Sequence, residues 1–143
     1  MKRIRLTYGL LSLSFLIAGM CIYLFFRDLN NIIFIKWIPV FDFIKPVFVS
    51  LAPTISSHTL MYNLPDMFWF LSGILFFRYI WFYKMKEQYI YISCFYLSGT
   101  VFELSQLSEN VPGTFDYLDL LFMYIGAFVE GLLFNSLIRR RYV

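Results

Sequence analysis

Histidine, cysteine and charge are scarce in this chain, and each scarcity excludes a class of function. The sequence has one histidine, His58, and two cysteines, Cys21 and Cys94, which are too few for the ligand set of a structural zinc site. His58 lies in a polar stretch, APTISSHT, that we interpret as a solvated loop, away from the serines of the apolar segments. A Ser-His-Asp triad is therefore not expected. No glycine-rich phosphate-binding motif or calcium-loop spacing occurs, so we predict no metal and no cofactor.

Charged residues make up only 15% of the 143 residues, whereas hydrophobic residues make up 60% and aromatic residues 22%. A soluble domain of this size has no core for eighteen Phe and eleven Tyr. A bilayer accepts apolar side chains on every helix face, and Tyr and Trp at its two interfaces. The composition predicts an all-α integral membrane protein with a single domain, residues 1–143. The basic residues are not clustered as nucleic-acid binding requires, so no nucleic-acid partner is expected.

Four apolar segments are long enough to cross the ~30 Å hydrocarbon layer as helices. They are residues 6–26, 64–83, 88–107 and 119–138. The first segment has no charge and no small-residue cleavage site, so we predict that it is an uncleaved helix. Residues 32–52 are also apolar but contain two Lys, one Asp and two Pro, and we interpret them as an interfacial or re-entrant segment on the outer face. The predicted fold is a four-transmembrane-helix bundle.

Lys and Arg predict the orientation of this bundle. With four spans, nine basic residues lie at or near one face, and only Arg27, Lys36 and Lys45 lie at the other. Short cytoplasmic loops carry the excess of Lys and Arg, so both termini are predicted to be cytoplasmic. A fifth span through residues 32–52 would export the basic tail and place charges in lipid at about 3 kcal/mol each. Four spans are therefore the better interpretation.

Carboxylates gather in the stretch FELSQLSENVPGTFDYLD, residues 102–119, on the predicted outer side. Acidic residues solvate outer loops by default, and this accounts for Glu109. Asp116 or Asp119 could each cap the fourth helix and favour its dipole. Capping does not account for Glu103, which lies within the expected apolar layer, where an ionisable group normally faces the bundle interior.

Glu103 shares a helix face with Gln106, three residues further on. We predict an outward-facing acidic pocket between the second, third and fourth spans, with the Val-Pro-Gly turn at 111–113 folded over it. Asp66, at the start of the second span, is predicted to add a third carboxylate region to this pocket. Aromatic rings near the acids are available to stack on a ligand. The predicted ligand-binding residues are Glu103, Gln106, Asp116, Asp119 and Asp66.

Two further charges lie deep in the predicted spans. Arg78 is twelve residues beyond Asp66, and Glu130 is eleven beyond Asp119, on helices that run in the same direction. Their depths agree, so we predict an intramembrane ion pair between Arg78 and Glu130. Small residues at Ser72-Gly73, Ser98-Gly99-Thr100 and Ala127-x-x-x-Gly131 are expected to let the helices approach closely.

A spaced polar pattern runs through residues 64–131. It contains Leu-Pro-Asp-Met-Phe-Trp, Glu103-x-x-Gln106, a Pro-Gly turn, Asp116-x-x-Asp119 and Gly126-Ala127. This pattern resembles the VanZ-like family of small bacterial integral membrane proteins. The resemblance implies a multi-pass inner-membrane protein of the cell envelope, with teicoplanin resistance as the phenotype that named the family. Several polar positions frequent in that family are occupied here by Met67, Phe70, Gly113 or Thr114, and Met123, which implies a divergent member.

Two functions of different classes are consistent with these features. The first is a binding or accessory protein whose acidic pocket engages an envelope ligand, such as a precursor with a cationic or hydroxyl-rich head group. The second is a structural subunit that anchors or stabilises a larger membrane-protein complex. An enzyme ranks third, because carboxylates without a tuned base or a metal give little basis for catalysis. Membrane lipids are expected partners in every case.

Overall fold

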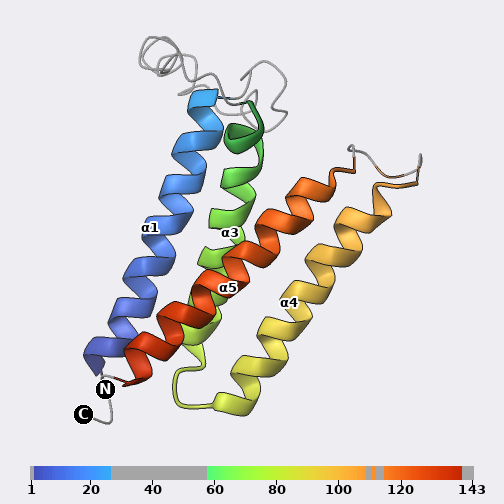
Figure 1. Ribbon diagram of the computed structural model, residues 1–143. Helices are drawn as coiled ribbons and strands as arrows, with labels where there is room; N and C mark the ends of the chain where they lie inside the picture. The colour runs from blue at the N-terminus through green and yellow to red at the C-terminus, as the bar shows by residue number, and fades with distance from the viewer. Residues whose placement is uncertain (1, 27–57, 109–110, 112–114, 140–143) are drawn as a thin grey trace, which may run out of the picture.

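The computed structural model describes residues 2–26, 58–108, 111 and 115–139, and this part of the chain is all helical (Figure 1). Its four helices are α1 (Lys2–Phe26), α3 (His58–Ile80), α4 (Met85–Ser105) and α5 (Tyr117–Arg139). They alternate in direction, so the start of α1, the α3–α4 turn and the end of α5 lie at the same end of the molecule. The segment predicted at 32–52 and most of the 111–113 turn lie outside the described residues.

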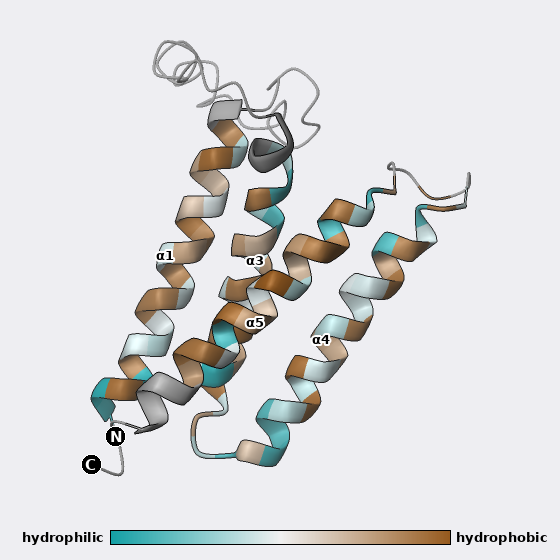
Figure 2. Ribbon diagram, in the orientation of Figure 1, coloured by the Kyte–Doolittle hydropathy of each residue, from teal (hydrophilic) through white to brown (hydrophobic). Residues whose placement is uncertain are grey.

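Among the described helices, α1 and α5 are long and apolar enough to cross a membrane, over Lys2–Leu24 and Tyr117–Phe134. Figure 2 shows this difference: hydrophobic colour predominates along α1 and α5, whereas much of α4 is pale, with hydrophilic residues at both ends. Because the helices alternate in direction, Lys2, Arg3, Lys84 and Lys86 gather at one end of the bundle. Asp66, Glu103 and Asp119 lie in the other half.

The second helix begins earlier than the sequence predicted. His58 is its first residue rather than part of a loop, so Asp66 lies inside α3 and does not open it. Pro65 is buried in the helix interior, although it cannot donate a hydrogen bond to the preceding turn. The expected start at residue 64 followed from the apolar run, since the polar stretch that contains His58 was interpreted as a loop before it. Contacts between this first part of α3 and α5, described below, favour the longer helix.

α3 is the central helix and packs extensively against α1 and α5. Ser12 of α1 and Ser72 of α3 each donate a hydroxyl hydrogen bond to the other's backbone carbonyl, at 2.9 and 2.8 Å. Such short polar contacts between small residues bring helix backbones together where lipid supplies no hydrophobic driving force. The buried cluster around them consists of Tyr8, Leu71, Leu75 and Phe82.

α4 is held away from α3 by aromatic rings. The ring of Phe95 of α4 lies against Gly73 of α3, and the ring of Phe70 of α3 lies against Gly99 of α4, so that a Cβ at either glycine would collide with the ring. The two rings also contact each other, with centroids 4.7 Å apart. The predicted small residues Gly73 and Gly99 therefore accommodate rings rather than a neighbouring backbone, and α4 contacts α3 and α5 much less than α1 and α5 contact α3.

Gly126, rather than the predicted Gly131, is the close contact between α3 and α5. A Cβ at Gly126 would lie 3.0 Å from the backbone oxygen of Met67, whereas a Cβ at Gly131 would have nothing within 4 Å.

We expect Gly126→Ala to lower the free energy of unfolding by about 1–3 kcal/mol, because the backbone of α3 must move. Gly131→Ala, the matched control on the same helix, should cause no loss. Equal stability of the two variants in a detergent unfolding titration would contradict the close α3–α5 contact.

Candidate functional site

A cavity of about 480 Å³ lies between α3, α4 and α5, in the half of the bundle away from the basic residues. Three helices supply its polar groups: Asp66 from α3, Glu103 and Gln106 from the end of α4, and Asp119 from the first turn of α5. The remaining lining residues are apolar: Trp69, Phe70, Phe95, Gly99, Phe102, Leu120 and Met123. Four of the five residues predicted from the sequence therefore line one cavity.

Asp116, the fifth predicted residue, does not line this cavity. It precedes the first residue of α5, Tyr117, and its carboxylate accepts a hydrogen bond from the backbone N–H of Leu118 at 2.9 Å. This is the arrangement of an N-cap, which satisfies an amide that the helix leaves unpaired. The backbone N–H of Asp116 donates to Glu103 Oε1 at 3.3 Å. Asp116 thus positions the site by joining the start of α5 to the end of α4.

Asp119 is held by a residue that the sequence analysis missed. Asn63 is only 2% exposed, and its Nδ2 donates to Asp119 Oδ1 at 2.7 Å. This bond joins the first part of α3 to the first turn of α5, and it helps to explain why α3 continues ahead of Pro65. The signal was present in the sequence, because Asn63 is three residues before Asp66 and so shares its helix face.

The end of α4 positions both Glu103 and Gln106. Glu103 lies in the last turn and is partly buried. Gln106 is the C-cap residue, and its backbone N–H bonds back to the carbonyl of Glu103 at 3.2 Å. The helix therefore ends within the cavity wall and presents one carboxylate and one amide side by side.

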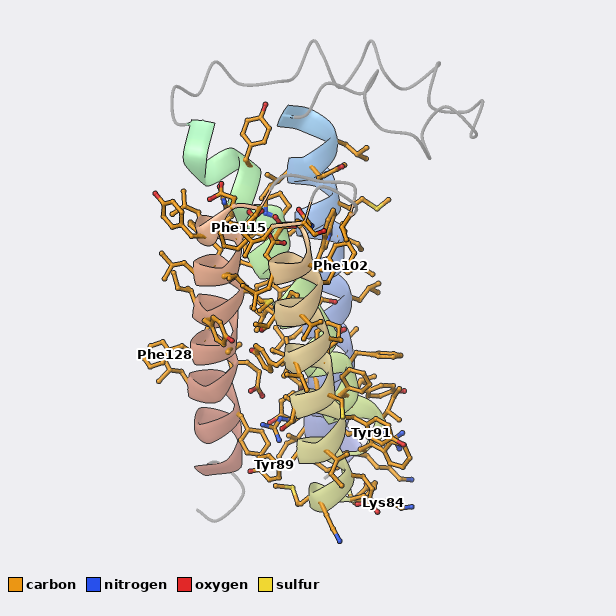
Figure 3. The ribbon with its side chains drawn as sticks, turned by 90° about the vertical axis from the view of Figure 1, so that its right-hand side faces the viewer. Lys84, Tyr89, Tyr91, Phe102, Phe115 and Phe128 are labelled. Atoms are coloured by element: carbon orange, nitrogen blue, oxygen red, sulfur yellow. The ribbon has the colours of Figure 1, made fainter. Side chains whose placement is uncertain are left out.

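Aromatic rings form the apolar wall of the cavity. Phe70 and Phe95 are the rings that separate α3 from α4, and the cavity continues beside them toward Trp69 and Phe102. Phe102 is largely exposed and projects from the upper part of α4 (Figure 3). Rings next to carboxylates suit a ligand that has both a polar or cationic group and an apolar portion, because the ring faces attract cations and apolar surface.

The predicted pair of Arg78 and Glu130 is present in the other half of the bundle. Arg78 Nε lies 2.9 Å from Glu130 Oε1, and each residue is only 5% exposed. The guanidinium also lies 3.7 Å from the ring centroid of Phe134. The pair joins α3 to α5. Neither residue lines the acidic cavity, so we assign the pair to the stability of the bundle rather than to ligand binding.

Gln88 extends this pair into a network, and the sequence analysis treated it only as the start of a span. Arg78 Nη1 donates to Gln88 Oε1 at 2.9 Å, and Gln88 Nε2 donates to the backbone carbonyl of Trp81 at 2.7 Å. Gln88 is 1% exposed. The sequence contained a signal for this bond, because Gln88 begins an apolar segment ten residues after Arg78, just beyond the short turn between the two helices. The network joins the start of α4 to α3 and α5, together with the stacked rings of Trp81 and Tyr91, whose centroids are 5.0 Å apart.

The acidic cavity can accept hydrogen bonds and positive charge from a ligand, since carboxylates supply acceptors and negative charge. Within the described ranges, no three His, Cys, Asp or Glu side chains are grouped closely enough to hold a metal ion. The arrangement is therefore suited to an organic cation or a polyhydroxyl group. Comparison of the chain with protein-family models, with curated proteins and with solved structures finds no match.

Proposed function

We propose that this chain is a VanZ-like, multi-pass protein of the bacterial inner membrane, and that its acidic cavity binds an envelope ligand from the outer side. The observation that carries the proposal is the convergence of Asp66, Glu103, Gln106 and Asp119 on one cavity with aromatic walls. Polar side chains are costly within apolar helices, and in membrane proteins they commonly mark a binding site or a pathway. The protein acts here as a binding or accessory protein in envelope chemistry, including glycopeptide-type resistance.

The distribution of charge supports four spans with cytoplasmic termini. Lys2, Arg3 and Arg5 begin α1, and Lys84 and Lys86 flank the start of α4, at the same end of the bundle. The positive-inside preference places this end in the cytoplasm, and the acidic cavity is then outside. α3 and α4, with 23 and 21 residues, are as long as a hydrocarbon crossing requires.

The chemistry of the cavity points to a lipid-linked cell-wall precursor as the ligand. Such a molecule has hydroxyl-rich sugars and amino groups that carboxylates can bind, together with an apolar chain that remains in the bilayer. Three helices surround the cavity, and α4 and α5 contact each other only sparingly. An amphipathic ligand can therefore place its head group among the acids while its chain lies among the aromatic and aliphatic residues.

Binding of the precursor by protein in lipid nanodiscs tests this proposal. We expect Asp119→Asn to weaken binding about tenfold or more, because a hydrogen bond to a charged group contributes roughly 1.5–3 kcal/mol. Asn keeps an oxygen that can accept the bond from Asn63, so folding should be preserved. Glu87→Gln, which removes a carboxylate at the other end of the bundle, is the control. If wild-type protein does not bind the precursor, or if both variants bind equally well, the binding function is wrong.

A structural subunit is the second candidate, and the exposed face of α4 favours it. Leu97, Val101 and Leu104 are exposed on a helix with few contacts to the rest of the bundle. In this case the acids serve to join helices: Glu103 accepts a hydrogen bond from the backbone N–H of Asp116, and Asp119 accepts one from Asn63. Stable co-purification with one defined membrane protein, unaffected by Asp119→Asn, would support this candidate over the first.

A further inference from the structure

An apolar groove of about 320 Å³ runs along the junction of α1 and α3, away from the acidic cavity. Leu6, Leu10, Leu13 and Leu16 of α1 line one side, and Phe76 and Tyr79 of α3 line the other. Gly9 and Ser12 form part of the lining, and the ring of Tyr79 lies against Gly9, where a Cβ would be 3.2 Å from the ring. The α1 lining runs from Leu6 to Leu16, or roughly 15 Å at 1.5 Å rise per residue, which suits one acyl chain.

Two arginines lie at the basic end of this groove. Arg3 is three residues before Leu6, and Arg5 is four residues before Gly9, so both share a helix face with lining residues. Arg5 is held in place, because its Nε donates to the backbone carbonyl of Tyr79 at 3.0 Å and its guanidinium lies 4.9 Å from the Tyr79 ring centroid. The bonds found for Arg5 among the described residues use only Nε, so Nη1 and Nη2 remain to bind an anion.

We propose that this groove is a binding site for an anionic phospholipid of the leaflet at the basic end. One acyl chain lies along the groove from Leu6 to Leu16, and the head-group phosphate binds the guanidinium groups of Arg3 and Arg5. Charge complementarity identifies the occupant, because planar guanidinium groups bind phosphate through paired hydrogen bonds and an apolar groove beneath them suits a lipid chain. This inference rests on the proposed membrane location, but it is independent of the acidic cavity and its ligand.

The head-group part of the site is tested by counting the lipids that remain bound in native mass spectrometry. The protein is released from vesicles of equal parts phosphatidylglycerol and phosphatidylcholine. We expect wild type to retain phosphatidylglycerol preferentially, and the double variant Arg3→Gln/Arg5→Gln to lower that preference about thirtyfold, since each basic residue near the surface contributes about 1 kcal/mol and about 1.4 kcal/mol is a factor of ten. Lys84→Gln/Lys86→Gln removes the same charge from the same end, but on α4, and should leave the preference unchanged. Equal losses in both double variants would mean general charge attraction and would overturn the site.

The acyl-chain part has its own matched pair of variants. Leu10 lines the groove and is 57% exposed, whereas Leu132 of α5 is 55% exposed and does not line it. Each lies about two helical turns from the basic end of its helix. Leu10→Trp fills the groove and should reduce phosphatidylglycerol retention severalfold, while Leu132→Trp should not. Unchanged retention in Leu10→Trp, with unfolding temperatures like that of wild type in both variants, would overturn the placement of the chain.

Discussion

Replacing Glu130 by Leu is expected to lower the free energy of unfolding by about 3–5 kcal/mol, because it leaves the guanidinium of Arg78 buried without its counter-charge. Arg78 and Glu130 are both 5% exposed, and their charged groups are 2.9 Å apart. The reciprocal variant Arg78→Met should also be destabilising, because it leaves the carboxylate of Glu130 buried without its counter-charge. Unfolding titrations of purified protein in detergent measure these differences.

The double variant Arg78→Met/Glu130→Leu distinguishes a paired charge from simple loss of packing. It removes both charges and keeps apolar volume, so its stability should lie closer to wild type than that of Glu130→Leu. Gln88 loses its bond from Arg78 in this variant but keeps its bond to Trp81, so recovery should be partial. If the two single losses simply add in the double variant, the two residues do not act as a pair.

Glu103→Gln is expected to leave the protein folded and to abolish the envelope phenotype that the proposed function confers. The Gln side chain has an oxygen that can accept the bond from the Asp116 amide, now 3.3 Å from Glu103 Oε1, so the end of α4 and the start of α5 remain joined. What is lost is the negative charge in a cavity that also contains Asp66 and Asp119. Because the proposed ligand would bind through that charge, its loss should remove binding rather than stability.

The proposed function predicts that expression of this protein raises resistance to teicoplanin, so growth in the presence of teicoplanin is compared between strains with and without each variant. We expect Glu103→Gln to reduce resistance to the level of the strain without the protein, and Glu87→Gln to retain it. Protein levels are measured by immunoblot in each strain. An unchanged phenotype in Glu103→Gln and in Asp119→Asn, at normal protein levels, would remove the cavity from the function and favour the structural subunit.

Apolar segments and charge spacing were sufficient to predict much of the architecture. Each described helix overlaps a predicted segment, because long apolar runs without strand-like alternation favour helices. The ion pair between Arg78 and Glu130 was predicted from their matching heights on helices that run in the same direction, since such residues can meet across a bundle. Glu103, Gln106, Asp119 and Asp66 were likewise predicted to lie at similar heights, and they line one cavity.

The errors have local causes. The second span was predicted to begin at residue 64 because the polar stretch with His58 was interpreted as a loop, but α3 begins at His58. Asn63 and Gln88 were missed because an amide in an apolar segment has no charge to require a partner, although both are almost fully buried and hydrogen-bonded. Asp116 was grouped with the pocket residues, with capping of the fourth helix as the alternative, and its carboxylate accepts the hydrogen bond of the Leu118 amide as a cap of α5.

The helical character of the described chain follows from its composition, and the division of charge between the two ends of the bundle follows from the order of apolar and polar segments. Which helices pack closely and which stand apart depends instead on contacts between residues that are distant in the chain. Ser12 and Ser72 bring α1 against α3, while the rings of Phe70 and Phe95 hold α4 away. This difference produces the cavity, since a space between helices depends on the sizes of side chains that face each other, and the partners of those side chains are distant in the sequence.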